Sequence, residues 1–160
     1  MFETYEHCVV GSFLHLQFTP AYRRDIFCDA VLIKFCRLEF QRIAQKLGVS
    51  IVECAFGPNH THVFIRGWKN YAIAYLANRF KGASSHYLRE NFWERVKTKL
   101  WGDKFWSEGY FAETIGRITT RKMEHYIERQ QSKHWAGKDY HIYLETHKEA
   151  EPQTHLTDYT

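Results

Sequence analysis

The spacing of hydrophobic residues along this 160-residue chain changes several times between the period of a strand and that of a helix. Residues 8–18 are rich in β-branched and aromatic side chains and predict a strand that Pro20 closes. Residues 25–48 carry apolar side chains at steps of three and four, which predicts a helix that Asp25 can cap and Gly48 can end. The core-facing stripe of this helix consists of Ile26, Ala30, Ile33, Cys36, Phe40, Ile43 and Leu47.

The rest of the chain continues the same alternation. Two short apolar runs separated by a Gly-Pro-Asn turn predict a β-hairpin. A helical stripe, a short strand, a glycine break and a final helix with a threonine cap follow. The predicted elements are strands at 49–56 and 60–66, a helix at about 71–90, a strand at 110–115, a break at Gly116, and a helix from Thr119 or Thr120 to about 134.

The element order β-α-β-β-α-β-α indicates an α+β protein. It is typical of the ferredoxin-like or RRM-like split βαβ fold, in which helices cover one face of an antiparallel sheet. A further C-terminal helix follows the sheet. We expect residues 1–135 to form one domain and residues 136–160 to form a polar tail without an assigned role. Because unrelated activities share this fold, it does not identify a function.

The composition of the chain excludes few classes of function. The formal net charge is +4, which permits a nucleic-acid partner without requiring one. Aromatic residues make up 17% of the chain, which is high; some must fill the core, and the rest are available to stack on bases. The four cysteines form no C-x-x-C pair, which favours a reducing cytoplasm over a disulfide scaffold. No stretch is long enough to span a membrane.

Two spacings carry candidate chemistry. His60 and His62 are two residues apart on a predicted strand, so their side chains point to the same face and can share a metal ion. Ten histidines make one such triplet a common chance event, and two surface histidines remain an alternative. Tyr126 and Gln130 are four residues apart on a predicted helix and therefore share a face. A tyrosine oxygen can act as a nucleophile, and a Gln carbonyl can bind Mg²⁺.

The order of these motifs resembles the single-tyrosine HUH transposase family of prokaryotic insertion sequences. The resemblance extends from about residue 5 to residue 134. It rests on five co-linear segments: Thr19-Pro20-Ala21-Tyr22-Arg23-Arg24, Pro58-Asn59-His60-Thr61-His62, Phe80-Lys81-Gly82-Ala83-Ser84-Ser85, Leu100-Trp101-Gly102-Asp103-Lys104-Phe105-Trp106-Ser107-Glu108-Gly109-Tyr110, and Tyr126-Ile127-Glu128-Arg129-Gln130.

The resemblance implies an enzyme that cuts and rejoins single-stranded DNA at hairpin ends of its own element. It implies Tyr126 as catalytic nucleophile, and His60, His62 and Gln130 as ligands of Mg²⁺ or Mn²⁺. It also implies a homodimer that can share active sites between subunits, with Gly116 as the hinge before the last helix. Candidate DNA contacts, by charge or by motif, are Arg23, Arg24, Arg79, Lys81 and Ser84.

Two residues depart from the family pattern. Thr61 replaces the bulky apolar residue between the histidines, and Asn59 replaces the usual Asp before them. Thr suits a strand and Asn suits a turn, so we expect the geometry to survive. Three alternatives stay open: a replication-initiator or relaxase-like HUH nuclease, a non-catalytic nucleic-acid-binding module on the same fold, and a zinc hydrolase built on the histidine pair.

Overall fold

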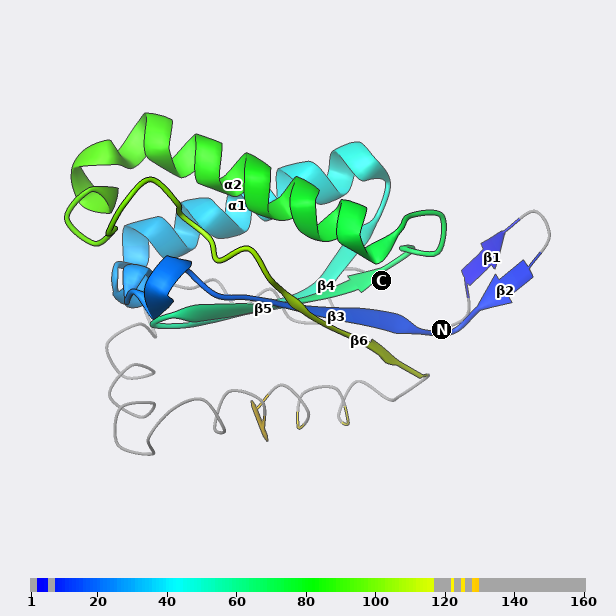
Figure 1. Ribbon diagram of the computed structural model, residues 1–160. Helices are drawn as coiled ribbons and strands as arrows, with labels where there is room; N and C mark the ends of the chain where they lie inside the picture. Colours follow the sequence, from blue (N-terminus) through cyan, green and yellow to red (C-terminus); the bar gives the residue numbers. More distant parts are fainter. Residues whose placement is uncertain (1–2, 6–7, 117–121, 123–124, 126–127, 130–160) are drawn as a thin grey trace.

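The computed structural model describes residues 3–5, 8–116, 122, 125, 128 and 129. Its centre is a four-stranded antiparallel sheet with the strand order β4-β5-β3-β6. Helices α1 and α2 lie together on one face of this sheet (Figure 1). The predicted α+β split βαβ fold is therefore confirmed. The elements of this core are β3 (Phe13–Phe18), α1 (Ala30–Leu47), β4 (Ser50–Gly57), β5 (His60–Arg66), α2 (Ile73–Val96) and β6 (Phe111–Ile115).

The strand predicted over residues 8–18 is two strands. β2 (Cys8–Val10) pairs with β1 (Glu3–Tyr5) in a separate two-stranded sheet, whereas β3 belongs to the central sheet. Gly11 and Ser12 lie between β2 and β3 without strand structure. Glycine is disfavoured inside strands, which explains why one apolar run supports two different pairings.

Helix α1 begins later than predicted. Asp29 caps it, because its Oδ1 accepts hydrogen bonds from the backbone N–H groups of Val31 (2.9 Å) and Leu32 (3.4 Å). Asp25, the predicted cap, instead precedes the short 3-10 helix η2 (Ile26–Cys28) and makes no side-chain cap hydrogen bond. The predicted end is confirmed, since Gly48 adopts a left-handed conformation with φ of 68°.

Helix α2 is longer than the predicted 71–90. It continues to Val96, which is fully buried in the core, as is Leu88 two turns earlier. Phe92, midway between them, has non-helical angles (φ −133°, ψ 32°) and packs against Phe35 of α1 with ring centroids 4.6 Å apart. This irregular residue interrupts the helical spacing, which explains why the sequence pattern is lost after residue 90.

The sheet has two chemically different faces. Residues that face the helices are apolar and include Leu16, Phe18 and Val63. The alternate residues of the same strands point to the opposite face, called the open face below because neither α1 nor α2 covers it (Figure 1). By alternation and register, the open face carries Phe13, His15, Gln17, His60, His62, Phe64, Phe111 and Glu113.

Thr61, which departs from the family pattern, fits the strand. Its side chain is buried, and its hydroxyl donates a hydrogen bond to the backbone carbonyl of Ala55 on β4 (3.1 Å). The register pairs Thr61 with both Phe18 and Phe56. The flanking histidines therefore keep the orientation that strand alternation predicts.

Candidate active site

His60 and His62 lie close together on the open face. Strand β5 begins at His60, directly after the turn at Pro58 and Asn59. The two imidazole ring centroids are 5.1 Å apart, and the ring planes are inclined at 77°. Both side chains are buried, with exposed fractions of 2% and 0%. The structure thus brings the two predicted ligands together and excludes the alternative of two solvent-exposed surface histidines.

Gly57 makes room for the His60 ring. The two residues pair across the hairpin between β4 and β5. A Cβ atom at Gly57 would lie 2.2 Å from Cε1 of His60, well inside any tolerated contact. Only glycine therefore allows the imidazole to lie over the backbone of the neighbouring strand.

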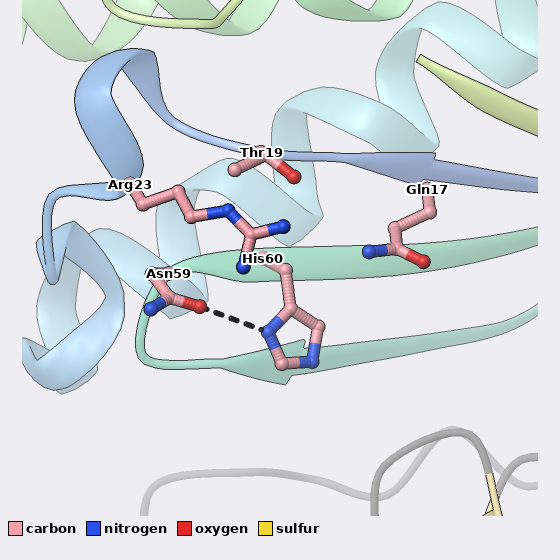
Figure 2. A pocket seen from close by; sticks show the side chains of 5 residues that line it. All are labelled: Gln17, Thr19, Arg23, Asn59 and His60. Atoms are coloured by element: carbon pink, nitrogen blue, oxygen red, sulfur yellow. Dashed lines mark hydrogen bonds between the residues drawn. The ribbon is translucent and has the colours of Figure 1, made fainter. Parts of the chain in front are cut away.

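The Nδ1 atom of each histidine faces a hydrogen-bond partner. Nδ1 of His60 is 3.2 Å from Oδ1 of Asn59, as Figure 2 shows. Nδ1 of His62 is 2.8 Å from Nε2 of His15 on the neighbouring strand β3. Neutral imidazole has one donor and one acceptor nitrogen, so donation through Nδ1 directs the lone pair to Nε2. Metal-binding histidines in proteins show this division of tasks between their two nitrogens.

The spacing of the two rings fits a shared divalent ion. An imidazole nitrogen binds such an ion at about 2.1 Å, which places the ring centroid about 3.2 Å away from it. Two rings at roughly 90–110° about one ion then have centroids about 4.6–5.3 Å apart. The observed 5.1 Å between His60 and His62 lies in this range.

Two imidazoles alone do not complete a metal site. Among the residues that the structure describes, no group of three or more His, Cys, Asp and Glu side chains is arranged to hold an ion. The predicted third ligand, Gln130, and the predicted nucleophile, Tyr126, both lie outside the described residues. Gly116, the predicted hinge, follows β6 and is exposed, and a Cβ atom added there would meet nothing within 4 Å.

A small pocket opens beside His60. It is lined by Gln17, Thr19, Arg23, Asn59 and His60, and has a volume of about 50 Å³ (Figure 2). Four of its five lining residues are uncharged polar or imidazole side chains, and Arg23 adds a permanent positive charge. This combination suits a phosphate group next to the candidate metal ligands.

An unusual turn places Arg23 at this pocket. Tyr22 and Arg23 both have positive φ angles, of 58° and 51°, although neither is glycine. Each such residue costs about 1–2 kcal/mol, so surrounding contacts must hold the turn. Two of these contacts are hydrogen bonds: the N–H of Ala21 to the carbonyl of Phe105 (2.9 Å), and the N–H of Arg23 to the carbonyl of Pro20 (3.0 Å). The local sequence did not predict positive φ angles at Tyr22 and Arg23.

The other predicted DNA contacts separate into two groups. Arg24 and Arg79 are exposed, and Arg24 donates through Nε to the carbonyl of Lys99 (3.0 Å). Lys81 is instead buried, and its amino group donates to the carbonyls of Glu108 (2.9 Å) and Gly109 (3.1 Å). Burial lowers the pKa of Lys81. Its charge stabilises the loop before β6, so we do not retain it as a DNA contact.

The side chain of Ser84 also forms hydrogen bonds inside the protein. Its hydroxyl donates to the carbonyl of Phe80 (2.7 Å) and accepts a hydrogen bond from Nε1 of Trp106 (3.0 Å). Ser84 is fully buried and Trp106 nearly so. This bond joins α2 to the loop before β6, and it removes Ser84 from the candidate DNA contacts.

Sequence reasoning assigned no role to His15. The structure places it on the open face, completely buried and hydrogen-bonded to His62. One local signal was present: His15 and Gln17 are polar residues two positions apart in a strand whose other residues are apolar. Their proximity to His62 depends on the pairing of β3 with β5, which the local pattern does not reveal.

A family model described as transposase IS200 like matches residues 8–130. The chain belongs to this transposase family. The transposase for insertion sequence element IS200 from Salmonella typhimurium is 29% identical over 123 residues, which cover 72% of this chain and 74% of that protein. The transposase of the same name from Salmonella typhi matches equally well. The chain is therefore a DNA transposase, which sets aside the replication-initiator and zinc-hydrolase alternatives.

Two solved structures share the fold of this transposase. A Deinococcus radiodurans R1 protein assigned as a transposase superposes with a TM-score of 0.64 at 23% identity, covering 80% of this chain and 97% of that one. A REP-associated tyrosine transposase bound to a REP hairpin superposes with a TM-score of 0.51 at 14% identity, covering 78% and 68% respectively. None of the described helices of this transposase is long and apolar enough to cross a lipid bilayer.

Proposed function

We propose that this transposase cleaves and rejoins single-stranded DNA at the ends of its own insertion sequence through a 5′-phosphotyrosine intermediate. Tyr126 is the nucleophile in this proposal, and His60, His62 and Gln130 hold Mg²⁺ or Mn²⁺. The main support is the pair of buried imidazoles with ring centroids 5.1 Å apart, beside a pocket that Arg23 lines. Family membership supplies the substrate class, DNA.

The reaction is an exchange of phosphodiester bonds. The Tyr126 oxygen attacks the phosphorus in line with the bond to the leaving 3′ oxygen. That bond breaks, which gives a 5′-phosphotyrosine link and a DNA strand with a 3′-OH. A second 3′-OH then attacks the same phosphorus and releases the tyrosine, so joining needs no ATP. The divalent ion, when bound, supplies positive charge at the scissile phosphate and at the leaving oxygen.

The partner in this proposal is a single strand whose ends fold into hairpins. The REP-associated tyrosine transposase, which shares the fold, is bound to a REP hairpin. We also propose a homodimer with active sites that the subunits can share, because one tyrosine handles one strand end and an exchange involves two ends. The proposed cellular location is the cytoplasm, where the element's DNA is present.

Arg23 contacts the scissile phosphate in this account. We expect Arg23→Ala to lower the affinity for single-stranded DNA by about 10- to 150-fold. This is the change that results from losing one charge-assisted hydrogen bond of about 1.5–3 kcal/mol. Loss of one phosphate contact should also reduce the slope of log affinity against log salt by about 0.7. Fluorescence anisotropy with the element's end at several salt concentrations measures both quantities.

Lys46→Ala is the matched control for Arg23→Ala. Lys46 is exposed in the last turn of α1, in the helix layer away from the open face. Removing its charge should leave both the affinity and the salt slope close to those of the parent protein. Equal effects of the two substitutions would show that Arg23 contributes only to the overall charge.

Two exposed aromatic rings, one of them on the residue that precedes Arg23, are suited to base stacking. Tyr22 and Trp101 are 66% and 63% exposed, and their centroids are 4.7 Å apart in an edge-to-face arrangement. Stacking on a base is worth about 1–3 kcal/mol, so Trp101→Ala should weaken single-strand binding by roughly 5- to 150-fold. Trp93→Ala is the control, since Trp93 is 48% exposed but lies on α2. Equal affinities of the two variants would contradict the stacking role.

A cleavage assay tests the proposed function as a whole. The element's end, as single-stranded DNA with a labelled 3′ end, is mixed with the transposase and Mg²⁺ and separated on a denaturing protein gel. We expect a labelled covalent band that EDTA abolishes and that the same sequence as duplex DNA does not form. Intact binding without any band would favour the non-catalytic nucleic-acid-binding module.

A further inference from the structure

Three polar side chains form a continuous row across the open face. They lie on three neighbouring strands: Glu113 on β6, His15 on β3 and His62 on β5. The register pairs His15 directly with Glu113, and it pairs Gln17, two residues further along β3, with His62. Side chains at such direct and diagonal positions of an antiparallel sheet are close enough to interact.

The contacts in this row hold the His15 ring in one orientation. Nε2 of His15 is 2.8 Å from Nδ1 of His62, and Nδ1 of His15 is 3.9 Å from Oε2 of Glu113. The ring stacks on Phe64 with centroids 4.4 Å apart and planes inclined by 8°. Phe111 contacts the ring edge-on at 5.5 Å. His15 is fully buried, while the carboxylate side chain of Glu113 is about half exposed.

We propose that His15, oriented by Glu113, is a positioning residue that sets the tautomer of His62 for metal binding. The carboxylate of Glu113 lies 3.9 Å from Nδ1 of His15, and its electrostatic attraction favours the proton of His15 on that nitrogen. Nε2 of His15 then accepts a hydrogen bond from Nδ1–H of His62. This leaves the lone pair of His62 on Nε2, which becomes the metal-binding atom. The inference rests on the proposed metal site and adds residues to it that the motif does not include.

The same arrangement recurs at the other histidine with different residues. Nδ1 of His60 faces Oδ1 of Asn59, an acceptor supplied by the turn. The two candidate ligands therefore have the same tautomer, one set by a neighbour in sequence and the other by a neighbouring strand. His15 is the part of this arrangement that only the sheet register reveals.

The first test needs no metal. Long-range ¹H–¹⁵N correlation spectra of histidine-labelled protein report which nitrogen of each imidazole carries the proton, with the His62 signals assigned from His62→Ala. We expect His62 to be protonated on Nδ1 in the metal-free protein. In His15→Phe, which retains the ring stacked on Phe64 but has no acceptor, this preference should be lost. A wild-type His62 protonated on Nε2 would overturn the proposal.

The second test measures Mn²⁺ affinity by isothermal titration calorimetry. His15→Phe should weaken binding by about 10- to 100-fold, the usual effect of removing a residue that orients a metal ligand. His15→Gln should recover part of this loss, because its carbonyl oxygen can take the place of Nε2. Glu113→Gln, at a half-exposed position, should give a smaller loss. His86→Phe, on the exposed surface of α2, is the control and should not change the affinity.

The outcomes separate this inference from the function on which it rests. Mn²⁺ binding that His60→Ala abolishes but His15→Phe leaves unchanged would overturn the role of His15 and leave the proposed function intact. A wild-type protein that binds no Mn²⁺ would overturn the proposed function and this inference with it. Thermal unfolding of each variant shows whether a loss of affinity is a loss of the fold.

Discussion

Replacing His62 with alanine will reduce metal-dependent cleavage of the element's end by about 10²- to 10⁴-fold, which corresponds to several kcal/mol of transition-state stabilisation. The physical reason is the loss of one of two imidazole ligands whose ring centroids are 5.1 Å apart. His60→Ala should have a similar effect. Single-turnover rates at saturating DNA, measured over a range of Mg²⁺ concentrations, separate weaker metal binding from slower chemistry.

The control for these alanine variants is His86→Ala. His86 is an exposed histidine on α2 that pairs with Glu90 at 3.4 Å, so its loss should leave the cleavage rate unchanged. Because His60 and His62 are buried, circular dichroism and thermal unfolding must show that their variants still fold. A folded His62→Ala protein with the parent's rate at every Mg²⁺ concentration would exclude His62 as a ligand.

Tyr126→Phe should abolish the covalent protein–DNA adduct and leave single-strand affinity unchanged. The substitution removes one oxygen atom, which is the proposed nucleophile, and keeps the aromatic ring. Gel detection of the adduct and anisotropy measurements of binding test the two halves of this prediction separately. Tyr110→Phe is the matched control: Tyr110 is 39% exposed, and its variant should form the adduct at the normal rate. An adduct formed by Tyr126→Phe would show that another residue is the nucleophile.

Local periodicity was sufficient for most of the fold. The apolar run after the Gly-Pro-Asn turn predicted the bounds of β5. The period of two in a strand predicted the common orientation of His60 and His62. The stripe in α1 predicted its buried face in the same way. The predicted start of α1 was wrong because Asp25 and Asp29 are both residues that can cap a helix. Tertiary packing decides between them: Phe27, in the turn before α1, is fully buried against Phe56 with centroids 4.9 Å apart.

The candidate active site was only partly predictable, because several of its contacts join residues that are far apart in the sequence. The metal-ligand pair is a local motif, whereas the contact of His15 with His62 joins residues 47 positions apart in the sequence. The position of Arg23 depends on a strained turn that is stabilised by a local hydrogen bond and by one to Phe105, far away in the sequence. Lys81 is a different case, since its positive charge suggested DNA binding but its amino group donates to the loop carbonyls of Glu108 and Gly109. Residue type alone does not reveal burial.

In the proposed reaction, Tyr126 forms a 5′-phosphotyrosine with single-stranded DNA. The most direct measurement is mass spectrometry of the covalent adduct after digestion with trypsin and nuclease. We expect a nucleotide attached through its 5′ phosphate to the peptide that contains Tyr126, and a 3′-OH on the released strand. A nucleotide attached to any other residue, or linked through its 3′ phosphate, would rule out this reaction.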